Sequence, residues 1–248
     1  MTAGLLRLDA RELGLTVGEA TILRDVTASV EAASIAVIGA NGSGKTTFAR
    51  LATGLVAPTR GSLRVAGFDA VDDAASLRRA SGLLFSNPDV QIIMPTVAED
   101  VAFTLKGRGV HRREIPVRVD DALARVGITE LRDAAAHTLS GGQKQLLAVA
   151  AVLVAEPTFL VADEPTAYLD GANARRIARL LLDPATPPVV LVTHDLALAA
   201  RCDVALRFRG GTLASVGDPA AEIAAYEAEL DSIDAHQHPD RGGDGGGP

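Results

Sequence analysis

The chain has 248 residues, a formal net charge of −7 and 48% hydrophobic residues, which suits one compact domain or one domain with a small subdomain. The acidic balance argues against nonspecific binding to nucleic acid, which needs a basic face, and the single cysteine excludes a disulfide framework and a cysteine metal cluster. The longest apolar run, residues 146–155, is far shorter than the roughly 20 residues that span a bilayer, and residues 1–10 lack the pattern of a signal peptide, so we expect any membrane association to be peripheral.

Strands are predicted in the first third of the chain wherever β-branched residues cluster or apolar residues alternate. These segments are residues 5–8, 26–30, 34–38, 62–66 and 82–85. Residues 35–38 are uniformly apolar, as expected of a strand that is buried on both faces. A glycine-rich turn follows and leads into a helix predicted over residues 45–55, where Phe48, Leu51 and Leu55 share a face.

The pattern is mostly helical between residues 87 and 155. Val97, Val101 and Leu105 are spaced four apart, and an Ala- and Leu-rich helix is predicted over residues 139–155. Strands are then predicted at residues 159–162 and 189–193, helices near 174–182, 196–201 and 219–230, and a β ribbon around 210–211. Residues 231–248 are polar and end in a glycine-rich run, which predicts a disordered tail.

Strands that alternate with helices imply a mostly parallel sheet covered by helices on both faces. We therefore predict an α/β fold whose core consists of residues 1–86 and 156–230. The helical residues 87–155 form a subdomain inserted between the two halves of that core.

The segment Gly39-Ala-Asn-Gly-Ser-Gly-Lys-Thr-Thr47 fits the phosphate-loop pattern G-x-x-x-x-G-K-[ST], with an apolar strand before it and a helix after it. Its glycines let backbone N–H groups converge on phosphate oxygens at a helix N-terminus. Lys45 is expected to reach the β- and γ-phosphates of ATP, and the Thr46 hydroxyl to bind Mg²⁺. A glycine turn that binds nothing would not explain the strand, the spacing, the lysine and the threonine together. The candidate nucleotide-binding residues are Gly39, Ala40, Asn41, Gly42, Ser43, Gly44, Lys45, Thr46 and Thr47.

Two carboxylates follow the apolar strand at residues 159–162. Beside a phosphate loop, Asp163 is expected to hold Mg²⁺ directly or through water, and Glu164 to act as the general base on the attacking water. Without the phosphate loop, an exposed acidic turn would explain the pair equally well.

The string Leu139-Ser-Gly-Gly-Gln-Lys-Gln145 places Ser140 as an N-cap with Gln143 three residues later, the spacing of a capping box. Gly141 and Gly142 expose free N–H groups at the helix tip, which makes it an anion site. A well-capped helix without a ligand is the alternative. The string resembles the signature L-S-G-G-Q of the ABC ATPase family, and the order of phosphate loop, signature and Asp-Glu pair is also that of the family.

The resemblance covers roughly residues 5–230. It implies a P-loop NTPase (RecA-like) fold with an N-terminal antiparallel β subdomain, an inserted α-helical subdomain, and a head-to-tail dimer of ATPase subunits. In such a dimer, Ser140, Gly141 and Gly142, with Gln143, contact the ATP held by the other subunit. Asp170 belongs to the loop that crosses the dimer seam. His194 matches the switch histidine that contacts the γ-phosphate and orients the base, so that Glu164, His194 and Lys45 form the implied catalytic set.

Two positions depart from the family pattern. Where the family places an aromatic side chain on the adenine, this chain has no aromatic before Phe48, and Val17 is the replacement we consider. Where the family has the Q-loop glutamine, this chain has Ser86, which is too short to reach Mg²⁺ and the attacking water unless a water molecule bridges the gap.

Residues 86–103 resemble the N-P-D-x-Q…P-T-V-x-E-D-V-A-F segment of energy-coupling-factor (ECF) ATPases, the motors of vitamin and of cobalt or nickel uptake systems. Locally, the same segment is a turn followed by a helix that Thr96 and Glu99 cap. The resemblance implies a peripheral position on the cytoplasmic face of the cell membrane, with a transmembrane coupling subunit and a substrate-binding membrane subunit as partners.

In that family the segment borders a groove that receives coupling helices. Gln91, Ile92 and Met94 would lie there, unless they belong to the core of the chain itself. The solute stays open, with biotin as a guess, and so does the choice between a second copy and a paralogue as the ATPase partner.

Other functions are open at this stage. The chain could serve another ABC importer or an exporter, or be a soluble ABC ATPase without a transport role. A nucleic-acid-linked ABC ATPase would need a long coiled-coil insert, zinc sites or a second cassette, and the sequence has none. A small-molecule kinase with a phosphate loop would leave residues 139–145 unexplained.

Overall fold

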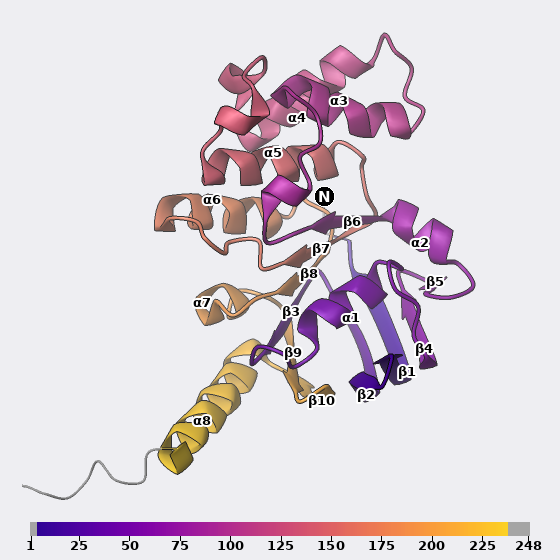
Figure 1. The fold of residues 1–248 in the computed structure, drawn as a ribbon, viewed down its shortest axis with the longest axis vertical. Coiled ribbons are helices and arrows are strands. Elements are labelled where there is room, and N and C mark those ends of the chain that lie inside the picture. Colours follow the sequence, from indigo (N-terminus) through magenta and orange to yellow (C-terminus); the bar gives the residue numbers. More distant parts are fainter. Residues whose placement is uncertain (1–3, 238–248) are drawn as a thin grey trace, which may run out of the picture.

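The computed structural model describes residues 4–237, which form two β-sheets with helices packed around and between them (Figure 1). The first sheet has four antiparallel strands in the order β2-β1-β4-β5. Its strands are β1 (Leu6–Val17), β2 (Ala20–Ala32), β4 (Arg60–Val65) and β5 (Phe68–Asp69). The α/β class and the N-terminal antiparallel subdomain are therefore confirmed.

The second sheet has six strands in the order β10-β9-β3-β8-β7-β6. Neighbouring strands are parallel except for the β9–β10 ribbon. Its strands are β3 (Ser34–Gly39), β6 (Ser81–Leu84), β7 (Phe159–Asp163), β8 (Val189–Val192), β9 (Val204–Arg209) and β10 (Thr212–Gly217). The ribbon predicted around residues 210–211 is the β9–β10 pair.

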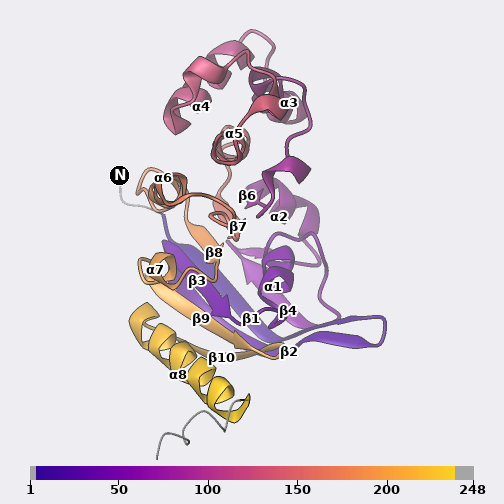
Figure 2. The same ribbon diagram turned by 60° about the vertical axis from the view of Figure 1, so that its left-hand side comes forward.

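Both faces of the second sheet are buried, which explains why its central strands are uniformly apolar. On β3, Ile35 and Val37 face a cluster shared with the first sheet and α1 (Lys45–Ala52), whereas Ala36 and Ile38 face a cluster shared with the helices that follow residue 96. Helix α1 lies between the two sheets (Figure 2). The phosphate-loop residues just before α1 are thereby held at the carboxyl edge of a rigid sheet.

The helical insert forms a layer beyond the β6 edge of the sheet (Figures 1 and 2). It contains α3 (Val97–Gly107), α4 (Ile115–Val126) and α5 (Gly141–Leu153), with short 3-10 turns at Pro88–Val90, Thr129–Leu131 and Ala136–Thr138. Both predicted capping boxes are present, one from Thr96 and Glu99 and one from Ser140 and Gln143. The long predicted helix therefore begins at Gly141 rather than at Leu139.

The remaining helices are α2 (Ala74–Ala80), α6 (Gly171–Leu181), α7 (Leu196–Ala199) and α8 (Pro219–Gln237). Helix α8 extends beyond the predicted end at residue 230, so the first part of the predicted tail is helical, and residues 238–248 lie outside the described residues. Arg207 on β9 holds α8 through Glu222 at 3.1 Å and Glu229 at 2.9 Å. Among residues 4–237, no helix combines the length and apolarity needed to cross a membrane.

The first hairpin is longer than predicted, and α2 and β5 were not predicted at all. Strands β1 and β2 continue to the pair Val17–Ala20, although Glu12 and Asp25 interrupt the pattern with positive φ angles of 45° and 51°. These irregularities and the charged residues around them hide the alternation on which the prediction depended.

Candidate functional site: a cavity at the phosphate loop

A cavity of about 770 Å³ lies where parallel strands β3, β6, β7 and β8 end. The carboxyl edge of a parallel sheet is the usual place for a ligand site in such folds. Its lining residues come from the phosphate loop, from the loops after the other strands and from α8: Gly39, Ala40, Asn41, Ser86, Glu164, Ala167, Tyr168, His194, Tyr226 and Leu230. The structure thus brings together residues that are separated by up to about three quarters of the sequence.

Backbone conformation explains the glycines of the phosphate loop. Gly39 and Gly44 have φ angles of 141° and 101°, which side chains rarely tolerate. A Cβ atom on Gly39 would also overlap the carbonyl oxygen of Phe208, and one on Gly44 would overlap the side chain of Leu23. The loop is further fixed by the Gly211 N–H, which donates to the Ser43 carbonyl at 3.1 Å.

The Lys45 side chain folds back along the phosphate loop. Its ammonium donates to the carbonyl oxygens of Gly39 at 2.7 Å and Ala40 at 2.9 Å. Burial lowers the pKa of Lys45, while Glu164 and Asp163 act in the opposite direction. The Ser43 hydroxyl is buried in the same loop without a hydrogen-bond partner. The loop thus holds the Lys45 ammonium and contains a buried Ser43 hydroxyl without a partner. Both features suit the binding of a phosphate group.

The side chains of Thr46 and Asp163 lie next to each other beside the phosphate loop, as they must if both are to bind one cation. The Thr46 hydroxyl donates to the Asp163 carboxylate at 3.1 Å. Burial raises the pKa of Asp163, and the hydrogen bond from Thr46 partly offsets this. Within the described part of the chain, no cluster of three or more His, Cys, Asp or Glu residues could hold a metal by itself. Two hard oxygen ligands fit Mg²⁺ that takes its other ligands from phosphates and water.

Glu164 and His194 form a close pair at the same cavity. Nδ1 of His194 lies 2.7 Å from Oε2 of Glu164, and the His194 backbone N–H donates to the same oxygen at 3.2 Å. Glu164 has a φ angle of 52°, which is strained for a residue with a side chain, and its N–H is tied to the Val192 carbonyl at 2.8 Å. The backbone therefore holds this carboxylate at the cavity at a cost in conformational energy.

The candidate residues Ser140, Gly141, Gly142 and Gln143 lie at the tip of α5 and are not among the residues that line the cavity. Gly142 packs against Asn173 of α6, and the Asn173 amide donates to Asp170 at 2.7 Å. The Asp170 carboxylate also caps α6, and these hydrogen bonds lower its pKa. The α5 tip is thus connected to the loop that precedes α6.

We predict that Gly142→Ala lowers the free energy of unfolding by about 1 kcal/mol, because the added methyl group would displace the Asn173 amide and break its bond to Asp170. The expected fall in Tm is about 2–4 °C in a thermal melt. Gly141→Ala is the matched control, since its Cβ would meet no atom within 4 Å. Equal melting temperatures for the two variants would contradict this account.

Two cavity residues, Tyr226 and Leu230, were not singled out from the sequence, and Ala167 and Tyr168 entered only as part of the loop that ends at Asp170. Tyr168 is 96% exposed and has a φ angle of 62°. Tyr226 and Leu230 come from α8, and their spacing of one helical turn is the only signal that the sequence gave for a shared face. Val17, considered for the adenine, is 61% exposed near the hairpin turn and does not line the cavity.

An apolar groove of about 320 Å³ lies between β6, α3 and the end of α5. Of the residues expected there, only Gln91 lines it. Ile92 is partly buried against the core, and both Ile92 and Met94 line a neighbouring hollow. The exposed apolar residues of the groove are Ile93 and Phe103. The contact of Gln91, Ile92 and Met94 with coupling helices stays a prediction.

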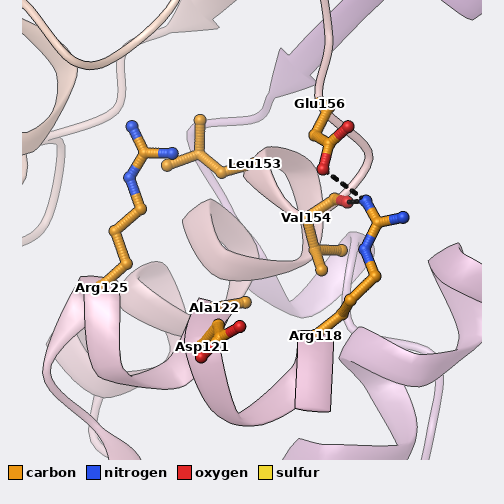
Figure 3. Close-up of a pocket in the computed structure, with 7 residues that line it drawn as sticks. All are labelled: Arg118, Asp121, Ala122, Arg125, Leu153, Val154 and Glu156. Carbon is orange, nitrogen blue, oxygen red and sulfur yellow. Dashed lines mark hydrogen bonds and ion pairs between the residues drawn. The ribbon is translucent and has the colours of Figure 1, made fainter. Parts of the chain in front are cut away.

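A smaller cavity of about 190 Å³ separates α4 from the end of α5 (Figure 3). The Arg118 guanidinium on α4 donates hydrogen bonds to the Val154 carbonyl at 3.1 Å and to the Glu156 carboxylate at 2.7 Å (Figure 3). These contacts connect α4 to the C-terminus of α5, and none of the predicted site residues lies there.

Comparison with known proteins gives consistent relatives. The sequence profile of the family described as ABC transporter matches residues 23–167. The biotin transport ATP-binding protein BioM of Rhizobium etli is 40% identical over 225 residues, which cover 91% of this chain and 99% of that protein. The energy-coupling factor transporter ATP-binding protein EcfA1 of Lacticaseibacillus paracasei is 40% identical over 200 residues, which cover 79% of this chain and 72% of that protein.

Among solved structures, cbiO1 from Clostridium perfringens, described as part of the ABC transporter complex cbiONQ, has a TM-score of 0.78. It is 30% identical, and the match covers 94% of this chain and 95% of that chain. The likeness therefore extends over both sheets and the helical insert.

Proposed function

The chain belongs to the ABC transporter family, and we propose that it is the ATP-binding and ATP-hydrolysing subunit of an ECF-type importer. The observation that carries the proposal is the single cavity to which the phosphate loop, the Glu164–His194 pair and Ser86 all contribute. The Thr46–Asp163 pair lies beside the same loop. This arrangement is what phosphoryl transfer to water requires.

In the proposed reaction, Lys45 and the loop N–H groups hold the phosphates of ATP. Thr46 and Asp163 would hold Mg²⁺, which when bound supplies positive charge against the phosphate oxygens. Glu164 accepts a proton from the attacking water, and His194 keeps that carboxylate in place through the 2.7 Å contact. The hydrogen-bonded partner thus fixes the base before the substrate arrives.

A second ATPase subunit completes the proposed site. The cavity of one chain lacks Ser140, Gly141 and Gly142, which lie at the N-terminus of α5. The Ser140 N–H donates to the Gln143 side chain at 2.8 Å, so the N–H groups of Gly141 and Gly142 are the ones that would meet an anion. A head-to-tail pair would place this tip over the cavity of the other chain. The pairing also gives the exposed Tyr168 a surface to contact.

The importer role is supported by the names of the relatives, which include a biotin transport protein and an energy-coupling factor protein. We propose that the chain sits on the cytoplasmic face of the membrane and that a vitamin such as biotin, or a transition-metal ion, is the solute. The groove with Ile93 and Phe103 would contact a membrane subunit.

The proposal is tested by purifying the tagged chain from detergent-solubilised membranes of its own host and assaying ATP hydrolysis. We expect membrane subunits to copurify, and Lys45→Ala to remove the ATPase activity of the preparation. Recovery of soluble protein alone would contradict the transport role, and activity that survives Lys45→Ala would contradict the assignment of the site.

We also predict that Ser86→Gln keeps or raises kcat for ATP hydrolysis. Ser86 lines the cavity, and a glutamine there has the length to reach the metal and the attacking water that the resemblance assigns to it. Steady-state ATPase assays at saturating ATP measure the effect. A large loss of kcat would show that Ser86 has a role of its own that a longer amide cannot fill.

A further inference from the structure

The side chain of Gln91 binds the backbone at the end of β6. Its amide nitrogen donates to the Leu83 carbonyl at 3.1 Å, and its amide oxygen accepts from the Phe85 N–H at 3.3 Å. They tie a residue of the groove to the strand that leads into the catalytic cavity.

The position of β6 in the sheet explains why this amide fits. Strand β6 is the outermost strand, with β7 on its inner side. The Ala80 carbonyl accepts from Thr158 on that inner side, so the groups of Leu83 and Phe85 point to the open edge. A side-chain amide carries the same donor and acceptor as a peptide group, and Gln91 therefore takes the place that a neighbouring strand would occupy.

Ser86 follows Phe85 directly and lines the catalytic cavity, whereas Gln91 lines the groove beside Ile93. One of the two hydrogen bonds fixes the N–H of Phe85, the residue directly before Ser86, and the other fixes the Leu83 carbonyl. Without them, the strand end would be free to move the Ser86 side chain relative to Glu164, because no further neighbouring strand holds that edge.

The rest of the segment after Ser86 has its own attachments. Asp89 pairs with Lys144 of α5 at 2.7 Å. The buried Asp100 carboxylate accepts from the N–H groups of Ile93 at 2.8 Å and Met94 at 3.0 Å. Loss of the Gln91 amide would therefore release the β6 end without releasing the whole segment.

We propose that Gln91 is a positioning residue for ATP hydrolysis: it holds the end of β6 so that Ser86 is placed in the catalytic cavity. The inference rests on the proposed ATPase function.

The test uses Gln91→Met, which keeps the length of the side chain and removes both hydrogen bonds. We expect kcat for ATP hydrolysis to fall about tenfold and KM for ATP to change less than about twofold, since the phosphate loop is untouched. Val90→Ser is the matched control: Val90 is exposed in the same segment, and we expect its replacement to leave kcat unchanged. Thermal melts accompany both variants.

A double-mutant cycle with Ser86→Ala tests whether the effect of Gln91→Met on kcat is transmitted through Ser86. If Gln91 acts through Ser86, the double variant loses about as much kcat as the more damaging single variant. Additive losses, an unchanged kcat in Gln91→Met, or a loss that follows a matching fall in Tm would overturn the proposal. If the unaltered chain itself hydrolyses no ATP, the proposed function fails, and that result is distinct from all of these.

Discussion

Glu164→Gln is expected to lower kcat for ATP hydrolysis by about 100-fold or more, because an amide cannot accept the proton of the attacking water. The two side chains have the same shape, so the contact with His194, whose Nδ1 lies 2.7 Å from the carboxylate, should change little. ATP affinity should stay within about twofold, since the phosphate loop and the Thr46–Asp163 pair are unchanged. Single-turnover assays and nucleotide-binding titrations measure the two quantities.

Glu156→Gln is the matched control. Glu156 has the same unusual φ angle of 52° as Glu164, but it pairs with Arg118 (Figure 3) and does not line the cavity at the phosphate loop. The control therefore shows whether a loss of activity comes from removing the carboxylate at the cavity or from replacing a glutamate that has this backbone conformation. Unaltered turnover in Glu164→Gln, or an equal loss in Glu156→Gln, would remove Glu164 from the role of base.

Features encoded by short strings could be predicted from the sequence. The glycines at 39 and 44 are required by local φ angles, and Ser140 and Gln143 form the capping box that their spacing indicates. The order of these strings along the chain also led to the correct fold class. Such features depend on neighbours within a few residues, so they can be predicted without tertiary information.

Features that depend on tertiary contacts were not predictable. Tyr226 reaches the cavity only because Arg207 on β9 fixes α8 through ion pairs, and neither residue carries a motif. Of two neighbouring isoleucines, Ile93 is exposed and lines the groove, whereas Ile92 is partly buried against the core. Which of the two adjacent isoleucines is exposed depends on tertiary packing. The apolar run Ile92–Ile93 carries no pattern that predicts it.

Two inactive variants of the chain should restore each other when mixed. Lys45→Ala removes the phosphate ligand of the loop. Ser140→Asp keeps an N-cap on α5, because aspartate caps as well as serine and its charge suits a helix N-terminus. The new carboxylate would, however, repel the γ-phosphate of the ATP held by the other subunit. We expect each variant alone to lose nearly all ATPase activity while its melting temperature stays close to that of the unaltered chain.

The expected recovery follows from the proposed head-to-tail arrangement. In a mixed dimer, one site combines both defects, and the other combines the intact loop of the Ser140→Asp chain with the intact α5 tip of the Lys45→Ala chain. Half of the dimers in an equal mixture are mixed, and each has one working site of two, so about a quarter of the original activity should return. The double variant mixed with Lys45→Ala is the control and should stay inactive, since every loop is then defective. If the two single variants also stay inactive together, two copies of this chain do not share their sites, and the α5 tip must serve a different ATPase subunit.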